Sequence, residues 1–220
     1  IGRVARDVAL ILKHSGPGAR ERRRPACTLG LGGNVDHESC LPDSTCFFYV
    51  PAMSETSFID TDRHFGGLDR LYGRPAQEKL AGTHIAVAGI GGVGSWCVEA
   101  LARSGVGALT LIDLDHIAES NINRQLHALT ETLGVSKIEA MARRVYGINP
   151  GCRVSLVDDF VTPENVRGVL PPDLSLLIDC TDQASAKIAM ILEARTRLVP
   201  IVVSGGAGGN AAGENSASGQ

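Results

Sequence analysis

The stretch VAGIGGVGSW at residues 87–96 decides the fold. An apolar run, His84–Ala88, leads into it. The pattern G-x-G-x-x-G follows, in which glycine permits a tight turn and close approach of the backbone to a ligand. A helix that begins there offers N–H groups and a positive dipole end to phosphate. The stretch therefore predicts a nucleotide site at a strand-to-helix turn, formed by Gly89, Gly91, Gly92 and Gly94.

The alternation of strand and helix continues along the chain. Strand-like apolar runs occupy residues 84–88, 108–112, 153–157, 174–178 and 199–203. Helix-like segments lie between them at residues 92–103, 136–146, 163–169 and 182–195. This order predicts an α/β fold: a Rossmann-like, doubly wound, mainly parallel sheet with helices on both faces. In such sheets the ligand lies at the carboxyl ends of the strands, so the residues directly after each run are the candidates.

Composition excludes several other classes. The 220 residues carry a formal charge of -3, which gives no electrostatic argument for nucleic acid. The six cysteines form no C-x-x-C pair, which disfavours a structural zinc site and favours free thiols in a reducing compartment. No apolar run reaches the roughly 20 residues of a membrane helix. The sequence thus predicts a cytoplasmic protein without a membrane segment.

The two ends of the chain differ from its middle. Residues 1–52 contain a basic cluster and a Gly-, Pro- and Ser-rich stretch without sustained period, so we expect a disordered extension there. It is either sequence upstream of a natural start at Met53 or an Arg-rich targeting segment. Residues 53–209 form the expected nucleotide-binding domain. Residues 210–220 are expected to be an unstructured tail, with the sheet cut short after Gly209.

The residues after the second strand decide which nucleotide is bound. Asp113, 19 residues after Gly94, is placed to accept hydrogen bonds from a ribose, which alone favours an NAD enzyme. The next segment adds Asn121, Arg124, Gln125 and Lys137. A dinucleotide needs little positive charge there, whereas attack on a phosphorus of ATP requires cations over the phosphate oxygens. The segment therefore favours ATP.

Two aspartates follow the fourth strand, in LLIDCTDQ at residues 176–183. Asp179 and Asp182 are expected at the carboxyl edge of the sheet, where a carboxylate can hold Mg²⁺ against phosphates. Asp182 is alternatively the N-cap of the following helix, since aspartate is a favoured cap residue. Both roles remain open.

Together these motifs resemble a known family. G-x-G-G-x-G, L-I-D-x-D, S-N-x-N-R-Q, G-x-x-K and D-C-T-D, in this order, are similar to the E1-like superfamily of ubiquitin-activating and sulfur-carrier-activating enzymes of the ThiF and MoeB type. The resemblance implies that Asp113 binds the ATP ribose and that Asn121, Arg124 and Lys137 bind phosphates. It also implies that Asp182 holds the magnesium. Arg124, Lys137 and Asp182 are thereby the implied catalytic residues.

The flanking segments resemble one branch of this superfamily. FGGLDRLYG at 65–73, INPGCRVSLVDDFVTPENV at 148–166 and SGGAGG at 204–209 look like the tRNA threonylcarbamoyladenosine dehydratases. The resemblance implies ATP-dependent activation of a carboxylate on the modified adenosine beside the anticodon, followed by ring closure with loss of water. It further implies a homodimer in which Arg70, or else Arg63, reaches the neighbouring subunit's ATP. A sulfur-transfer protein is a further implied partner, and the family's C-terminal half is missing here.

Three other functions remain open. The chain could be an adenylyltransferase for a ubiquitin-like sulfur carrier protein, an NAD(P)-dependent oxidoreductase, or a nucleotide-binding fragment without activity. Carboxylate activation needs no covalent protein nucleophile, so Cys97, Cys152 and Cys180 are expected to be buried structural thiols. His127 is expected to be a structural histidine rather than a general base.

Overall fold

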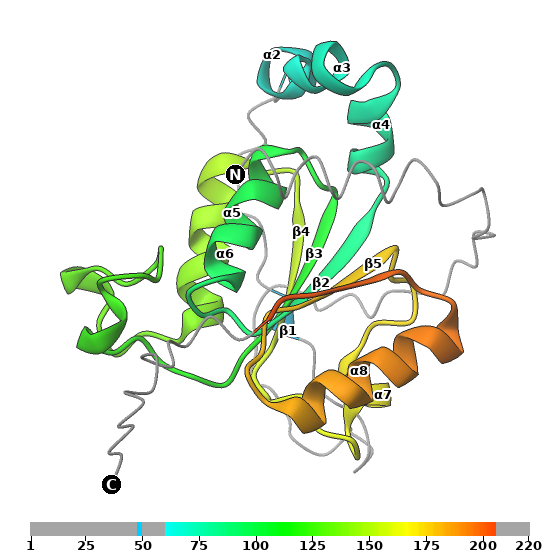
Figure 1. Ribbon diagram of the computed structural model, residues 1–220. Helices are drawn as coiled ribbons and strands as arrows, with labels where there is room; N and C mark the ends of the chain where they lie inside the picture. The colour runs from blue at the N-terminus through cyan, green and yellow to red at the C-terminus, as the bar shows by residue number, and fades with distance from the viewer. Residues whose placement is uncertain (1–47, 50–59, 206–220) are drawn as a thin grey trace, which may run out of the picture.

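A single sheet lies at the centre of the computed structural model, which describes residues 48–49 and 60–205 (Figure 1). Within these residues the strand order is β1-β4-β3-β2-β5-β6. Strands β2 to β6 are parallel, and β1 pairs antiparallel with β4. The strands are β1 (Phe48–Tyr49), β2 (His84–Ala88), β3 (Ala108–Ile112), β4 (Arg153–Val157), β5 (Leu176–Asp179) and β6 (Ile201–Val203). The predicted α/β fold with a mainly parallel sheet is confirmed.

The first three predicted strands have the bounds expected from the sequence. They could be predicted because a parallel strand is covered on both faces and is therefore almost wholly apolar; every residue of β3 is buried. The last two strands begin two residues later than predicted. Before β6, Leu198 takes a left-handed conformation and the Val199 N–H bonds to the Ala194 carbonyl, so both residues end the preceding helix.

Helices cover both faces of the sheet, as predicted (Figure 1). On one face α5 (Gly94–Arg103) and α6 (Lys137–Ile148) pack against alternate residues of β2, β3, β4 and β5. On the other face α7 (Val166–Val169) and α8 (Ala184–Arg197) pack against the strand residues that alternate with these, whose side chains point the other way. The two resulting cores make this a doubly wound sheet.

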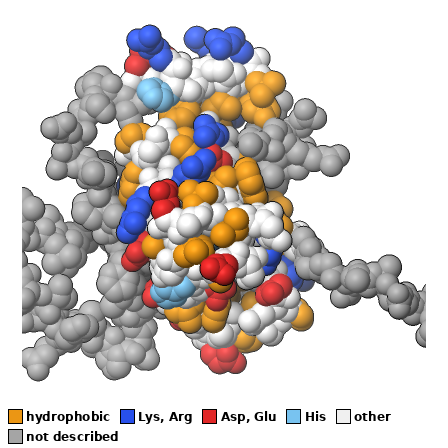
Figure 2. Space-filling model, turned by 90° about the vertical axis from the view of Figure 1, so that its left-hand side faces the viewer, with side chains coloured by type: hydrophobic (Ala, Val, Ile, Leu, Met, Phe, Trp, Pro, Cys, Tyr) orange, Lys and Arg blue, Asp and Glu red, His pale blue; other side chains and the backbone are white. Residues whose placement is uncertain are grey.

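A buried carboxylate joins α5 to α6. Glu99 on α5 is 3% exposed and accepts hydrogen bonds from Arg103 on the same helix and from Arg144 on α6. Burial by itself raises the pKa of Glu99, but the bonds from Arg144 and Arg103 outweigh it, so the pKa lies below its ordinary value. Figure 2 shows this side of the molecule, where arginine and lysine side chains lie among apolar ones.

The order of the strands places a ligand site between β2 and β5. From β2 the chain moves outward through β3 to β4, and then crosses to β5 on the other side of β2. Helices that follow β2 and β5 therefore lie on opposite faces, and their first turns diverge at the carboxyl ends of these two strands. The loop at residues 89–94 lies at this point.

Three short helices precede β2 in the chain and lie at the end of the sheet opposite the loop at residues 89–94 (Figure 1). They are α2 (Thr61–Phe65), α3 (Gly67–Tyr72) and α4 (Ala76–Ala81). Phe65 anchors them, since its buried ring packs against Gly105, where an added Cβ would lie 3.0 Å from Phe65 Cγ. Because α4 leads directly into the amino end of β2, the sheet separates these helices from the loop at residues 89–94.

The predicted disordered extension, residues 1–52, lies outside the described residues except at Phe48–Tyr49. There the backbone pairs with β4 and extends the sheet, so these two residues differ from the prediction. Pairing supplies partners to a strand edge that would otherwise be open. The predicted tail, residues 210–220, and the end of the sheet after Gly209 also lie outside the described residues. Within residues 60–205, no helix is long and apolar enough to cross a membrane.

Candidate nucleotide-binding site

The glycine loop between β2 and α5 contains two positions that accept only glycine. Gly89 has φ +83°, and an added Cβ would lie 2.9 Å from the carbonyl carbon of Cys180. At Gly94 an added Cβ would lie 1.8 Å from the Gly89 oxygen. The loop is therefore pressed against its own backbone and against the residue that follows β5.

The other two glycines of the pattern have space around them. An added Cβ at Gly92 would be 3.5 Å from Arg124 Cδ, and one at Gly91 would be 3.8 Å from Gln125 Nε2, both ordinary contacts. Packing within the protein thus does not require glycine at Gly91 or Gly92. Both residues line the cavity described next.

A cavity of about 580 Å³ opens beside this loop at the carboxyl ends of the strands. Its volume lies in the range of small-molecule sites. The structure brings nine of the eleven predicted site residues to it: Gly89, Gly91, Gly92, Asp113, Asn121, Arg124, Gln125, Lys137 and Asp182. Gly94 does not line the cavity but shapes the loop from behind. Arg70 is exposed on α3, at the other end of the sheet.

Asp113 fixes the glycine loop to the end of β3. One carboxylate oxygen accepts a hydrogen bond of 2.6 Å from the Ile90 N–H, and the other accepts one of 2.9 Å from the Asp115 N–H. The residue is 7% exposed and borders the cavity. Each carboxylate oxygen has a second lone pair, so Asp113 can hold the loop and still accept from a hydroxyl in the cavity.

Arg124 is held at the cavity rim by the crossover segment that follows β3. Its Nη1 donates to the Ser120 carbonyl at 2.7 Å and to Asn123 Oδ1 at 3.0 Å. Its own carbonyl accepts a hydrogen bond of 3.1 Å from Trp96 Nε1 on α5. Nearby, the buried Asn121 side chain accepts from the Ala118 N–H at 3.0 Å. The segment thus places a planar, permanently charged group above the glycine loop.

Lys137 opens α6 with a buried ammonium group. Its side chain is 7% exposed, and Nζ lies 2.6 Å from Asp115 Oδ2. The Asp115 side chain is 53% exposed and lines the same cavity. A buried charge requires a partner, and here that partner is open to solvent. The prediction did not include Asp115 as a site residue, although it is the second aspartate of the L-I-D-x-D motif.

His127 supports the loop from below. Its Nε2 donates to the Ile90 carbonyl at 2.8 Å, and the ring is buried. Burial is the main cause that lowers the pKa of His127, and the charge of Lys137 lowers it further, against the raising effect of the Ile90 carbonyl. The ring is absent from the cavity lining. This geometry supports the structural role predicted for His127.

The two aspartates after β5 have different surroundings. Asp179 is fully buried; it accepts bonds from the Thr181 N–H and hydroxyl and pairs with Lys187 Nζ at 3.1 Å. Asp182 is exposed and lines the cavity. The alternative that Asp182 is an N-cap is wrong, because α8 begins at Ala184 and its N-cap residue is Gln183.

Sequence reasoning missed the loop between β4 and α7. Asn165 holds it: its Nδ2 donates to Asp159 Oδ2 at 3.1 Å and to the Phe160 carbonyl at 2.7 Å, and its Oδ1 accepts from the Thr162 N–H at 2.7 Å. Asp159 and the 43% exposed Phe160 thereby line the cavity. The signal that could have revealed them is their position directly after a predicted strand.

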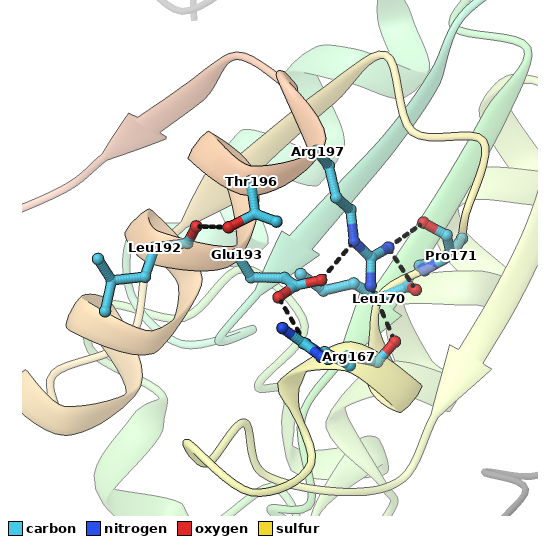
Figure 3. A network of polar contacts seen from close by, with 7 residues as sticks. All are labelled: Arg167, Leu170, Pro171, Leu192, Glu193, Thr196 and Arg197. Carbon is cyan, nitrogen blue, oxygen red and sulfur yellow. Dashed lines mark hydrogen bonds and ion pairs between the residues drawn. The ribbon is translucent and has the colours of Figure 1, made fainter.

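A second ionic network fixes α7, which follows that loop (Figure 3). Glu193 on α8 accepts from Arg197 Nε at 2.7 Å and Arg167 Nε at 3.3 Å, and the bond from Arg197 is the main cause that lowers its pKa. Arg197 also donates to the carbonyls of Leu170, Pro171 and Arg167. One guanidinium therefore satisfies the carbonyls at the end of α7 and holds the helix against α8.

Comparison with known proteins agrees with this geometry. The model of the ThiF family matches residues 62–212. The chain belongs to the ThiF family. Its relatives include the tRNA threonylcarbamoyladenosine dehydratases of Escherichia coli, 52% identical over 67% of this chain and 55% of that one, and of Haemophilus influenzae, 47% identical over 67% and 57%.

Solved structures show the same fold. A crystal structure of the E. coli tRNA N6-threonylcarbamoyladenosine dehydratase in complex with ATP has a TM-score of 0.65 and 51% identity to this chain. The match covers 67% of this chain and 61% of that one. The chain thus spans little more than half the length of the curated relatives it matches.

Proposed function

We propose that this chain is the nucleotide-activating part of an ATP-dependent tRNA threonylcarbamoyladenosine dehydratase. One observation carries the proposal: the cavity beside the glycine loop is lined by Arg124, Lys137 and Asp182 together. A dinucleotide oxidoreductase has no use for two cations and a carboxylate at this place. The identity of 52% to a dehydratase supports that branch of the family.

The chemistry needs activation of a poor electrophile. The substrate carboxylate attacks a phosphorus of ATP and becomes a mixed anhydride: an acyl-adenylate if pyrophosphate leaves, or an acyl-phosphate if ADP leaves. A nucleophile on the same side chain then attacks the acyl carbon and closes the ring, and the bond to AMP or phosphate breaks. The substrate thereby loses the elements of one water, which are taken up in the cleavage of ATP. The protein's part is to hold the reacting groups and to stabilise charge, which requires no covalent intermediate with a side chain.

The cavity residues divide this work. Backbone N–H groups around Gly91 and Gly92, at the start of α5, face the phosphates, and Asp113 faces the ribose. Arg124 offers its fork to the phosphate oxygens, and Gln125 and Asn121 border them. Lys137 supplies a mobile cation, because its partner Asp115 is exposed and a phosphate can take its place.

Asp182 fits a magnesium site of the kind that ATP brings with it. Mg²⁺ takes most of its ligands from water and phosphate and only one or two from carboxylates. Among the described residues no group of three metal-binding side chains exists, which suits such a site and not an all-protein cage. Asp182 would hold the ion, which would neutralise phosphate charge when bound.

The remaining proposals concern the assembly. Arg70 belongs to α3, which lies at the opposite end of the sheet from the cavity (Figure 1), and we propose that it reaches the ATP of a neighbouring subunit in a homodimer. We further propose a domain spanning residues 53–209, a cytoplasmic location and a sulfur-transfer protein as partner.

The decisive experiment offers the chain ATP, Mg²⁺ and tRNA that carries threonylcarbamoyladenosine. Mass spectrometry of the digested nucleosides should show the loss of one water, and Arg124→Ala should abolish it because phosphate charge is no longer stabilised. An unchanged nucleoside despite intact ATP binding would contradict the proposed dehydratase activity of this chain. Carrier-protein adenylation would instead support the adenylyltransferase alternative, and hydride transfer to NAD the oxidoreductase.

A further inference from the structure

Trp96 is an exposed aromatic residue in the first turn of α5. It is 45% exposed and is absent from the hydrophobic cores that the described residues form. Its indole Nε1 donates a hydrogen bond of 3.1 Å to the Arg124 carbonyl. Core packing therefore does not account for a tryptophan at this position, whereas the hydrogen bond joins α5 to the segment that carries Arg124.

The two hydrogen bonds of Arg124 Nη1 stay within its own segment, since they go to the Ser120 carbonyl and to Asn123 Oδ1. The backbone of this segment is also tied to itself. The N–H groups of Arg124 and Gln125 both bond to the Asn121 carbonyl, at 3.1 Å and 2.9 Å. These bonds fix the guanidinium relative to its own segment. Its place relative to the glycine loop depends on bonds that cross to α5 and to the loop.

Several hydrogen bonds make that crossing. Ser95 Oγ on α5 accepts from the Leu126 N–H at 3.2 Å, and His127 Nε2 donates to the Ile90 carbonyl at 2.8 Å. Ser95 and His127 are buried, so these two bonds fix the segment from beneath. The bond from Trp96 lies on the exposed side and acts on the backbone of the arginine itself.

The glycine loop gives these bonds a fixed base. An added Cβ at Gly94 would lie 1.8 Å from the Gly89 oxygen, and one at Gly89 would lie 2.9 Å from the Cys180 carbonyl carbon, so backbone is tightly packed here. Cys180 is partly exposed and lines the cavity, which corrects the expectation that it is buried; Cys97 and Cys152 are buried as predicted. A group tied to the first turn of α5 therefore keeps its place relative to the loop.

We propose that Trp96 is a positioning residue, whose hydrogen bond to the Arg124 carbonyl holds the Arg124 guanidinium over the glycine loop before ATP binds. An added Cβ at Gly92 would lie 3.5 Å from Arg124 Cδ, so the arginine stem lies directly above the loop. A cation that is already in place need not be ordered by the phosphates, and less free energy is lost on binding. Trp96 is absent from the cavity lining and acts through Arg124. The inference rests on the function proposed above.

The test uses Trp96→Phe in the whole chain, which keeps an aromatic ring and removes the N–H donor. Thr196→Val is the matched control, because Thr196 Oγ1 also donates from an exposed residue to a backbone carbonyl, that of Leu192, at 2.9 Å. Thr196 is absent from the cavity lining. Isothermal titration measures the affinities for ATP and for adenosine. The ATP titration is repeated in Arg124→Ala and in the variant that combines Arg124→Ala with Trp96→Phe.

Trp96→Phe should bind ATP about three- to tenfold more weakly, as expected for the loss of one hydrogen bond. It should bind adenosine like wild type, because adenosine has no phosphate for Arg124 to contact. In the Arg124→Ala background the same change should have no further effect on ATP affinity. Thr196→Val should match wild type throughout. Unchanged ATP affinity in Trp96→Phe, an equal loss for adenosine, or the same fold loss in both backgrounds overturns the proposal.

Hydrogen exchange separates this proposal from the function on which it rests. The backbone amides of residues 121–128 should exchange about three- to tenfold faster in Trp96→Phe than in wild type, because the segment opens more easily. Thr196→Val should leave their exchange unchanged. Equal exchange in Trp96→Phe and wild type overturns the proposal. If the wild-type chain binds no ATP, the proposed function fails, while the exchange of these amides still decides whether Trp96 holds the segment.

Discussion

Two lysine–aspartate pairs stand at the carboxyl edge of the sheet, and they differ in what surrounds them. Lys187 and Asp179 join α8 to the end of β5; the aspartate is fully buried, and Lys187 also donates to the Ser204 carbonyl after β6. In the other pair Lys137 is buried, but its partner Asp115 is half exposed and borders the cavity. The first pair holds the fold together, and the second is open to exchange with a ligand.

The difference shows why a charged pair beside a site is not evidence of function by itself. Each of the two lysines pairs with an aspartate at the carboxyl edge of the sheet, so residue type alone does not tell them apart. Both carboxylate oxygens of Asp179 accept hydrogen bonds within the protein, from Thr181 and from Lys187, so a phosphate that replaced the carboxylate would leave Asp179 buried without its partner. Asp115 is exposed and remains hydrated when Lys137 binds a phosphate instead, so the exchange costs little free energy.

Breaking the closed pair should have the largest effect. Asp179→Ala leaves the largely buried Lys187 charge without its carboxylate partner, and the free energy of unfolding should fall by about 3–5 kcal/mol. Urea denaturation followed by circular dichroism measures it. Asp115→Ala is the matched change in the open pair and should lower stability by much less. Equal losses in the two variants would remove the distinction between the pairs.

The buried clamp of α5 and α6 offers a smaller and pH-dependent effect. Because the pKa of Glu99 lies below its ordinary value, its contribution to stability is fully present above the unfolded-state pKa of about 4.3 and is lost as pH falls through the folded-state pKa. Glu99→Gln should therefore lower the free energy of unfolding by about 2 kcal/mol at neutral pH. In urea titrations the difference in the free energy of unfolding between wild type and Glu99→Gln should become smaller below pH of about 4. A difference that does not change with pH would contradict an ionic role for Glu99.

Sequence patterns were sufficient for the sheet and for the loop. Strands β2, β3 and β4 have their predicted bounds because strands covered on both faces consist mostly of apolar residues. At Gly89 and Gly94 an added Cβ would clash with neighbouring backbone, and the G-x-G-x-x-G pattern predicts such a need for glycine. Polar residues directly after each strand could be predicted to gather at one edge, because parallel strands end there together.

The rest depended on contacts between distant parts of the chain. The ion pair between Lys137 and Asp115 joins two elements whose separation in sequence follows no local period. Asp182 was an open choice between cap and cavity because a helix start cannot be placed to the residue from its pattern. Phe160 was missed because an exposed aromatic in a loop carries no periodic signal.

The most direct test of the open pair is the ATP affinity of Lys137→Met, measured by isothermal titration with Arg143→Met as control. Arg143 lies on the same helix, is 72% exposed and pairs with Glu139 away from the cavity. If Lys137 passes from Asp115 to a phosphate, the Lys137 variant should bind ATP about 10- to 100-fold more weakly with its fold intact, as expected for loss of a charged hydrogen bond. The Arg143 variant should bind like wild type. Equal ATP affinity in all three proteins would contradict the account.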